Sequence, residues 1–267
     1  MFKIKKMPKM TKIITQIYEV QTPSEAEKLI ALGVDNIGSV IVSQESWKIP
    51  LIRETIKLVD SVETRSSLIP LFGDLDAILT ALDYYKPDIV HFCEALTFQN
   101  DGSGTYKEFL LLQENVKKRF PEIKIMRSIP IFQPGITEHP DAIKLAKLFE
   151  PVSDYFLTDT LLVKESGSCF DRQPVKGFVG ITGRTCDWDI AAKLVESTHI
   201  PVILAGGIAP ENVFDGIMRV LPAGVDSCTG TNAVDSKGRS IRFKKDFGKV
   251  KRFVDETRRA ERAIGHK

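Results

Sequence analysis

A regular alternation of short apolar runs with amphipathic segments constrains the fold of this chain most strongly. Eight apolar runs have the length expected of strands, and a helical pattern or a helix-bearing loop follows each of them. Apolar strands that alternate with amphipathic helices favour a parallel sheet covered by helices. The expected strands span residues 12–20, 36–42, 66–73, 88–93, 123–131, 154–160, 200–204 and 224–228.

Eight such units in about 250 residues is the count of a (β/α)8 barrel, so the predicted fold class is α/β, a single TIM barrel. A doubly wound open sheet is the alternative. Against it, the first expected strand is not followed by the G-x-G-x-x-G turn of dinucleotide-binding sheets. Residues 1–11 are rich in lysine and are expected to form a flexible N-terminal arm. Residues 12–267 are expected to form the barrel domain, with no linker inside it.

Three glycine-bearing turns lie close together in the C-terminal third, where the expected barrel places the loops after strands six, seven and eight. Turns that expose backbone N–H groups near the start of a helix favour anions, and barrels commonly hold a phosphate after strands seven and eight. The alternative is that these turns are only tight connections. The predicted phosphate-binding residues are Gly180, Thr182, Gly183, Gly206, Gly207, Thr229 and Gly230. A phosphorylated small molecule is therefore the expected partner.

Charge and cysteine content narrow the remaining function classes. The chain has 37 Lys and Arg against 35 Asp and Glu, and this balance gives no indication of a nucleic-acid or membrane-surface partner. No apolar run approaches the ~18 residues of a membrane span, and no secretory signal pattern opens the chain. The four cysteines lack C-x-x-C spacing, so no metal site or disulfide framework is expected. We expect a cytoplasmic, reduced protein, and a homodimer stays open.

Five stretches of this sequence resemble the phosphoribosylanthranilate isomerase family, a (β/α)8 enzyme family of tryptophan biosynthesis. They match a strand that ends in aspartate, the motif G-G-T-G-x-x-x-D-W, the motif P-x-x-L-A-G-G-L-x-P-x-N-V, the motif G-V-D-x-S-S-G, and a closing K-D-x-x-K-I-x-x-F-V. These stretches are residues 157–160, 180–188, 201–213, 224–230 and 245–254. Weaker agreement extends to the N-terminus, so the resemblance covers nearly the whole chain.

The resemblance implies an Amadori rearrangement, which converts an aldose-amine into a ketose-amine on a 5-phosphorylated pentose and needs no cofactor. An acid protonates the ring oxygen and a base removes the proton at C2. The family's acid, the aspartate that ends strand six, is matched by Asp159. The family's base is the cysteine of K-x-C-G at the end of strand one. Here Gln16 stands for that lysine, Tyr18 for the cysteine and Glu19 for the glycine.

The base is therefore open, and several residues are candidates for it. Tyrosine has a reference pKa of about 10, which suits general-base catalysis poorly, and Glu19 is the better base by chemistry. The family's Q-L-H-G after strand four becomes His91-Phe92-Cys93-Glu94, so His91 and Cys93 could face the site from one side of a strand. A thiol has a reference pKa of about 8.5, which a nearby cation would lower. For both residues, core filling is the alternative.

Five further residues carry expectations. Arg127 on strand five is costly inside a barrel unless it contacts an anion, so a substrate carboxylate or phosphate is its predicted partner. Asp187 is expected to cap a helix and Asp226 to have a structural role. The arginine of the family's S-P-R turn after strand two is absent, and Trp47 or Lys48 stands near its place.

Three functions remain open from the sequence. The first is a phosphoribosylanthranilate isomerase-like enzyme with Asp159 as the acid. The second is another phosphosugar isomerase or lyase on the same scaffold, with a base among His91, Cys93 and Glu19. The third is a non-catalytic paralogue that binds a phosphorylated ligand.

Overall fold

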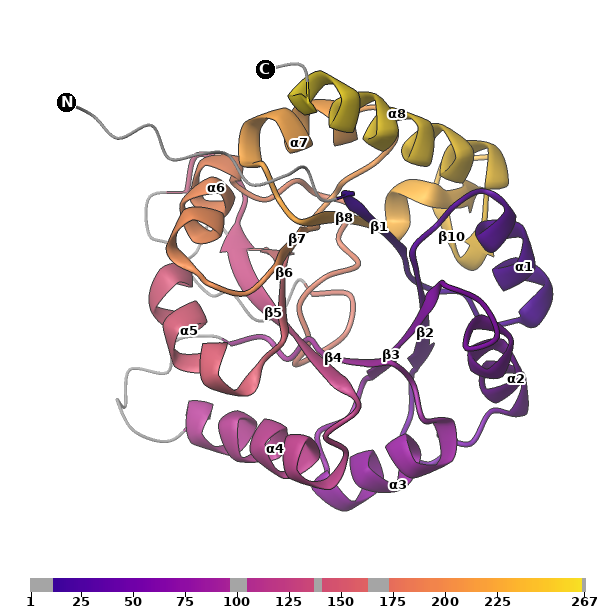
Figure 1. Ribbon diagram of the computed structural model, residues 1–267, viewed down its shortest axis with the longest axis vertical. Helices are drawn as coiled ribbons and strands as arrows, with labels where there is room; N and C mark the ends of the chain where they lie inside the picture. The colour runs from indigo at the N-terminus through magenta and orange to yellow at the C-terminus, as the bar shows by residue number, and fades with distance from the viewer. Residues whose placement is uncertain (1–11, 97–104, 137–140, 163–172, 266–267) are drawn as a thin grey trace.

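Eight parallel strands close into a barrel in chain order, and helices surround it (Figure 1). This arrangement comes from a computed structural model that describes residues 12–96, 105–136, 141–162 and 173–265. The predicted (β/α)8 barrel is confirmed, and the doubly wound sheet is excluded because β1 pairs with β8. The expected arm, residues 1–11, lies outside the described residues, so the division into arm and barrel stays a prediction.

The strands agree with the expected runs to within a few residues. They are β1 (Ile14–Ile17), β2 (Asn36–Ile41), β3 (Arg65–Pro70), β4 (Ile89–Phe92), β5 (Lys124–Phe132), β6 (Tyr155–Leu161), β7 (Val202–Leu204) and β8 (Gly224–Ser227). The first strand is shorter than the expected run because Glu19 has a φ of 64° and leaves the extended conformation. The chain therefore turns directly after Tyr18, at the position that matches the family's glycine.

Several helices begin at polar caps, which satisfy backbone N–H groups in their first turn. Thr22 accepts from Glu25 N, Asp74 from Ala77 N, and Asp187 from Asp189 N and Ile190 N. The capping role predicted for Asp187 is thus confirmed. The helices are α1 (Pro23–Ala31), α2 (Pro50–Val59), α3 (Leu75–Tyr85), α4 (Thr105–Arg119), α5 (Ala142–Phe149), α6 (Trp188–Ser197), α7 (Val213–Val220) and α8 (Phe247–Gly265), with short 3-10 turns η1 (Glu150–Val152) and η2 (Thr229–Thr231).

Alternation along the strands separates two cores. Side chains at every second position point to the barrel axis, and those between them pack against the helices. Leu157, Met126 and Ile203 belong to the inner core, whereas Phe92 and Phe156 pack among apolar residues of the helices. The inner core fills the barrel below the strand ends, so a ligand can enter only near the loops.

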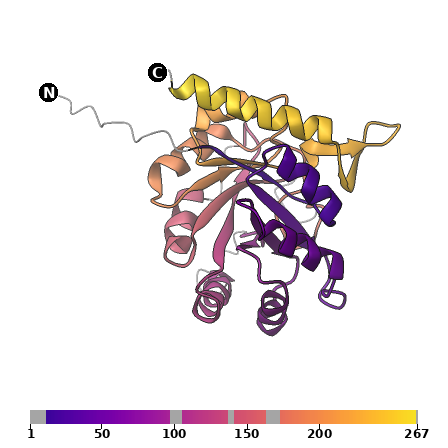
Figure 2. The same ribbon diagram turned by 45° about the vertical axis from the view of Figure 1, so that its right-hand side comes forward.

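A hairpin that the sequence analysis missed follows β8. It consists of β9 (Asn232–Val234) and β10 (Ser240–Lys245), and it projects from the barrel beside α8 (Figure 2). Its strands are short and their side chains are mostly exposed or half-buried, so they carry little of the apolar pattern that reveals a strand. Arg242 on the hairpin pairs with Glu19 after β1, which ties the hairpin to the barrel.

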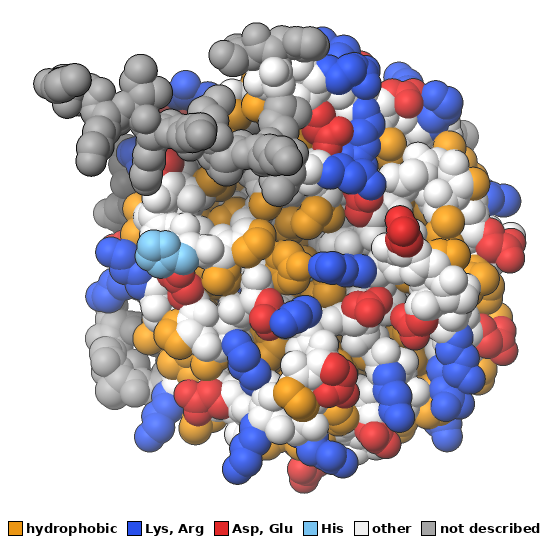
Figure 3. Space-filling model, in the orientation of Figure 1, with side chains coloured by type: hydrophobic (Ala, Val, Ile, Leu, Met, Phe, Trp, Pro, Cys, Tyr) orange, Lys and Arg blue, Asp and Glu red, His pale blue; other side chains and the backbone are white. Residues whose placement is uncertain are grey.

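The surface carries charges of both signs. On the face shown in Figure 3, Lys and Arg alternate with Asp and Glu around a centre with more hydrophobic side chains. Across the described residues, no helix is both long enough and apolar enough to cross a membrane.

Candidate active site

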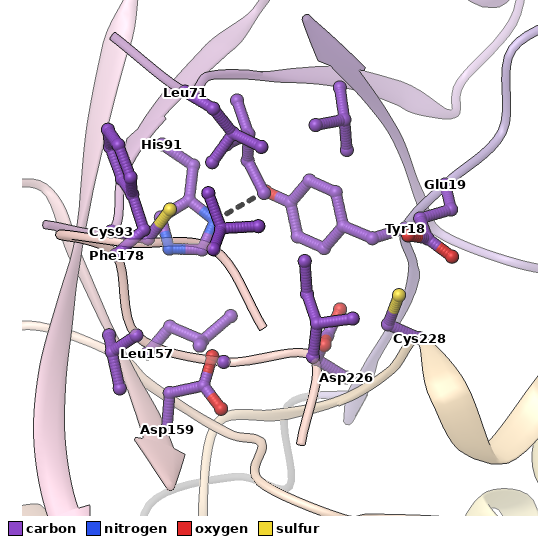
Figure 4. A pocket seen from close by; sticks show the side chains of 16 residues that line it. Tyr18, Glu19, Leu71, His91, Cys93, Leu157, Asp159, Phe178, Asp226 and Cys228 are labelled. Atoms are coloured by element: carbon purple, nitrogen blue, oxygen red, sulfur yellow. Dashed lines mark hydrogen bonds between the residues drawn. The ribbon is translucent and has the colours of Figure 1, made fainter. Parts of the chain in front are cut away.

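A cavity with about 530 Å³ of empty space lies among the strand ends and the loop after β6 (Figure 4). One part of its wall is apolar and includes Val40, Leu71, Leu157 and Phe178. The rest is polar, and all of the sequence candidates for acid or base contribute to it: Tyr18, Glu19, His91, Cys93 and Asp159. A wall of this mixed kind suits a ligand with a flat apolar part and a reacting polar part.

A second cavity, with about 320 Å³ of empty space, lies beside the first among the three glycine turns. The two cavities share Asp159, Ile181, Asp226 and Cys228. Six predicted phosphate-binding residues line the smaller cavity, namely Thr182, Gly183, Gly206, Gly207, Thr229 and Gly230. The seventh, Gly180, lines the larger one. A ligand that spans both cavities would place its middle beside the two aspartates.

The three glycine turns pack directly on one another. A Cβ on Gly207, whose φ is 65°, would overlap the backbone of Arg184 and Thr185 in the preceding loop. A Cβ on Gly230 would lie 2.7 Å from the carbonyl oxygen of Ile208. Among the described residues around this cavity there is no Lys or Arg. An anion here would therefore be bound by backbone N–H groups and threonine hydroxyls.

The relation of these turns to the helices differs from the prediction. The turn Gly206–Gly207 was expected to open a helix, but α7 begins only at Val213. Asn212 spans the interval, since it accepts from Ala209 N and donates to the carbonyl of Gly207. Thr229–Gly230 opens the single 3-10 turn η2. An anion in this cavity would therefore meet the backbone of these turns and not the first turn of a long helix.

Asp159 stands at the end of β6 with its carboxylate directed to the cavity (Figure 4). Its Oδ1 accepts from the backbone N–H of Thr160 at 2.8 Å. Gly180 has a φ of 109°, and a Cβ there would overlap Oδ2 of Asp159. Burial raises the pKa of Asp159 to about 7, against a smaller lowering effect of the Thr160 N–H. A carboxyl with this pKa can hold a proton near neutral pH and deliver it to a substrate.

Tyr18 lies in a chain of buried polar side chains. Its hydroxyl is 2.6 Å from Ser67 Oγ and 2.9 Å from His91 Nδ1, and His91 Nε2 is 2.8 Å from Ser128 Oγ. Burial raises the pKa of Tyr18 well above its usual value. Burial, with a smaller effect of the Arg127 charge, lowers the pKa of His91 to about 3. The tyrosine therefore stays protonated and the imidazole stays neutral with both nitrogens occupied, which argues against either as the base.

Glu19 is held by the hairpin. It accepts from Asn232 Nδ2 at 3.0 Å and pairs with Arg242 Nε at 2.6 Å. Burial acts to raise the pKa of Glu19, but the hydrogen bonds from Asn232 and Arg242 outweigh it, and the pKa is lowered. A fully ionised, neutralised carboxylate is a weak base at neutral pH. The geometry gives Glu19 an anchoring role in place of the predicted catalytic one.

Cys93 is buried on the cavity wall at the end of β4. Burial raises the pKa of its thiol well above the usual value, and the charges of Glu94 and Asp159 add to this effect. The positive charge of Arg127 lowers the pKa of Cys93, but this is the smallest of the effects and does not offset the others. The thiol stays protonated, which argues against Cys93 as the base.

Arg127 does not face the cavity, so the prediction of a substrate anion for it is corrected. It lies between the inward-facing Met126 and Ser128 on β5, and its side chain therefore points to the helices. There it pairs with Glu94, donates to Gln113 on α4, and lies over the ring of Phe149. The anion that makes its burial tolerable is a carboxylate of the chain itself.

The loop after β2 is also turned away from the cavity. The hydroxyl of Tyr85 on α3 donates to the carbonyl of Trp47 and accepts from the N–H of Ile49. Lys48 Nζ lies 5.0 Å from the ring centroid of Tyr84. Trp47 and Lys48 thus pack against α3, and neither is among the residues that line the two cavities.

Sequence reasoning assigned Asp226 a structural role, whereas the structure places it on both cavities. It lies on β8, is 7% exposed, and its Oδ1 accepts from Gln16 Nε2 at 3.2 Å. Burial raises the pKa of Asp226 to about 8, while the hydrogen bond from Gln16 lowers it less. The signal available in the sequence was its position, because an aspartate near the carboxyl end of a barrel strand faces the catalytic side.

Comparison with known proteins identifies the family. The family model for N-(5'-phosphoribosyl)anthranilate (PRA) isomerase matches residues 135–256. The PRA isomerase of Methanosarcina acetivorans is 30% identical over 270 residues, covering 96% of this chain and 98% of that protein. The chain belongs to the PRA isomerase family.

Solved structures of this family share the fold. Monomers made from the dimeric PRA isomerase of Thermotoga maritima superpose with a TM-score of 0.61 at 16% identity, covering 92% of this chain and 98% of that one. A PRA isomerase bound to reduced 1-(o-carboxyphenylamino)-1-deoxyribulose 5-phosphate also gives a TM-score of 0.61 at 16% identity, with coverage of 92% and 98%. Within the PRA isomerase family, this chain keeps the strand-six aspartate and the glycine turns and replaces the strand-one cysteine.

The described residues offer no group of three or more His, Cys, Asp and Glu side chains placed to hold a metal ion.

Proposed function

We propose that this chain is an isomerase that converts an N-(5'-phosphoribosyl) arylamine into the corresponding 1-amino-1-deoxyribulose 5-phosphate. The observation that carries the proposal is the position of Asp159 between a phosphate-sized cup of backbone turns and an apolar pocket. The cup would hold the 5-phosphate, the pocket would hold the aromatic ring, and the sugar would lie against the carboxyl. Membership of the PRA isomerase family makes PRA the first substrate to test.

The acid step follows from the state of Asp159. With a pKa raised to about 7, its carboxyl carries a proton in a large share of molecules at neutral pH. Delivery of this proton to the ring oxygen would open the sugar and leave an iminium ion. The carboxylate that remains would stabilise this cation inside a site of low polarity. The second proton transfer, from C2, needs a base.

A second substrate class is favoured by the composition of the apolar pocket. Anthranilate carries a carboxylate, yet no Lys or Arg is found among the described residues that line the larger cavity. A buried carboxylate without a cation or donors is costly. An N-(5'-phosphoribosyl) derivative of a neutral arylamine would avoid this cost, so the alternative is an isomerase for such an amine.

The decisive experiment compares purified protein on N-(5'-phosphoribosyl)anthranilate and on the matching aniline derivative, which differs only by the carboxylate. Turnover of either substrate, lost in Asp159→Ala, supports the proposal. A higher kcat/KM on the aniline derivative selects the second substrate class. Absence of turnover on both, with ribose 5-phosphate still raising the melting temperature, would leave a protein that only binds phosphosugars. A ligand at 100 times its Kd stabilises by about 2.7 kcal/mol, so the shift is easily measured.

A genetic test complements the assay. Rescue of a tryptophan auxotroph that lacks PRA isomerase would support PRA as the substrate, and growth that survives Asp159→Ala would contradict the role of Asp159. A homodimer, as in the Thermotoga maritima protein, is proposed for this chain and would be tested by sedimentation equilibrium. The cytoplasmic location expected from the sequence stays a prediction.

A further inference from the structure

Asp226 and its neighbours form a layer of polar side chains across three adjacent strands. Asn36 on β2 pairs in register with Gln16 on β1, and Gln16 pairs in register with Asp226 on β8. Asn36 Nδ2 donates to Gln16 Oε1 at 3.1 Å, which turns the amide so that Gln16 Nε2 donates to Asp226 Oδ1. These two hydrogen bonds fix one oxygen of the Asp226 carboxylate, and Asp226 still lines both cavities.

The neutral amide of Gln16 has a chemical consequence. Gln16 stands where the family has the lysine of K-x-C-G, and an ammonium group there would be an opposite charge beside the carboxylate. Such a charge within hydrogen-bond distance lowers a carboxyl pKa by about 1–3 units. With glutamine in its place, the pKa of Asp226 stays high, at about 8. A carboxylate of raised pKa is a stronger base.

Asp159 and Asp226 act on each other across the region that the two cavities share. They extend from β6 and β8, with β7 between them, and repulsion from Asp159 contributes to the raised pKa of Asp226. Between about pH 7 and 8 the two carboxyls therefore hold close to one proton. Since the pKa of Asp226 is the higher of the two, that proton lies mostly on Asp226, and the minor form, with the proton on Asp159 and a free carboxylate on Asp226, is the reactive one. The titratable or charged groups coupled to this pair are Tyr18, Cys93, Cys186, Cys228 and Lys245.

We propose that Asp226 is the general base of this enzyme and takes the role that the strand-one cysteine has elsewhere in the family. The assignment rests on the isomerase function proposed above. It follows from position, since Asp226 lies on the strand next to β1 and borders the same cavity as Tyr18. It also follows from exclusion, since Tyr18, His91 and Glu19 are each engaged by other side chains.

The proton and electron balance closes within the pair. Asp159 gives its proton to the ring oxygen, the C1–O bond breaks toward oxygen, and the nitrogen lone pair forms C=N. Asp226 removes the proton from C2, the C–H electron pair becomes the C1=C2 bond, and the C=N electrons return to nitrogen. Asp226 then returns its proton to C1 while the C2 hydroxyl gives its proton to Asp159. C2 is oxidised and C1 is reduced in one molecule, so no co-reactant is required.

The first test is Asp226→Asn, with Asp74→Asn as the matched control. Asp74 caps α3, where asparagine serves equally, and it lines neither cavity. We expect Asp226→Asn to lower kcat by about 10²–10⁴-fold, the range for a lost acid or base. Stabilisation by ribose 5-phosphate should be retained. Asp74→Asn should keep wild-type kcat. An Asp226→Asn variant with more than a tenth of wild-type kcat would overturn the proposal.

Chemical rescue separates a base from a structural carboxylate. Asp226→Ala removes the carboxylate and leaves room for a small acid, so added formate should restore part of kcat in a concentration-dependent way. Loss of deuterium from 2-deuterated substrate measures the C2 deprotonation step. In Asp159→Ala, formate should not speed up this step. Lack of rescue in a folded, ligand-binding Asp226→Ala variant counts against the proposal.

Gln16→Lys tests the same assignment without removing the carboxylate. The ammonium group should lower the pKa of Asp226. The acidic limb of the plot of kcat/KM against pH should therefore shift to lower pH by about 1 unit or more. An unchanged acidic limb would show that another group is the base. If wild-type protein turns over neither phosphoribosyl substrate, the proposed function fails, whereas an active wild type with an unaffected Asp226→Asn overturns only this inference.

Discussion

The two sides of this active site are built differently. The side proposed to bind phosphate consists of loops after β6, β7 and β8, where glycines allow the backbones to pack closely. The proton-transfer side consists of side chains at the ends of β1, β4, β6 and β8. The family model matches residues 135–256, which include the whole phosphate side. A backbone site depends on local geometry and tolerates few changes, whereas a side-chain site can move its chemistry from one strand to its neighbour.

Removal of the acid on the proton-transfer side should give the largest loss of activity. Asp159→Asn keeps the shape and the hydrogen bond from Thr160 N–H but cannot donate the carboxyl proton. We expect kcat/KM to fall by about 10²–10⁴-fold, with the melting temperature preserved. Steady-state kinetics and a thermal melt check this outcome. A variant with nearly full kcat would mean that the phosphate side is retained without the expected chemistry.

A change on the phosphate side should act on binding. Gly207→Ala places a methyl group against the backbone of Arg184 and Thr185 and separates two turns of the cup. Loss of one or two hydrogen bonds to a charged phosphate costs about 1.5–3 kcal/mol, which raises KM by about 10–100-fold. Gly33→Ala is the matched control, since Gly33 also has a positive φ, of 81°, but has no neighbour within 4 Å of the added methyl. Equal KM effects in both variants would contradict a phosphate site here.

The free energy of unfolding should fall as pH rises, because the proton-transfer side contains buried carboxyl groups. Burial raises the pKa of Asp159 to about 7, so the folded state keeps a proton that the unfolded chain loses near pH 4. The stability linked to this proton is fully present below pH 4 and is lost as pH rises toward 7, by about 1.4 kcal/mol per unit. Asp226, whose pKa is raised to about 8, loses stability over the same range, so urea unfolding of the wild type between pH 5 and 7 should show about twice this slope and Asp159→Asn about half of the wild-type value. A slope that stays the same in Asp159→Asn would rule out this carboxyl as its source.

The smallest effect on activity is expected at Tyr18. Tyr18→Phe leaves His91 and Ser67 without their shared partner, which costs about 1–3 kcal/mol of stability. Because Tyr18 is not the base, kcat should change by less than about 10-fold, far below the loss of a general base. Tyr85→Phe is a matched control with a similar loss of hydrogen bonds outside the cavity. Loss of all activity in Tyr18→Phe alone would return the base to strand one.

Much of the site could be predicted, and the misses have one cause. Asp159 and the glycine turns follow directly after apolar strands, so their position relative to the barrel is local information. Arg127 was hard to place because one residue of register decides whether a strand side chain faces the axis or the helices. Glu19 was misassigned because its partner, Arg242, is far along the chain on a hairpin with little apolar pattern.

The sequence by itself determined the barrel and the position of the glycine turns that are proposed to hold phosphate, because strand periodicity and glycine turns are properties of neighbouring residues. Only the tertiary structure decided which carboxylate pairs with an arginine and which accepts from a neutral amide. Asp226 is bonded to Gln16, and Glu19 to Arg242, through contacts that span more than two hundred positions. Burial raises the pKa of Asp226 although the hydrogen bond from Gln16 lowers it, whereas the hydrogen bonds from Asn232 and Arg242 outweigh burial and lower the pKa of Glu19. The catalytic use of a carboxylate depends on that difference, which arises when distant strands close into one barrel.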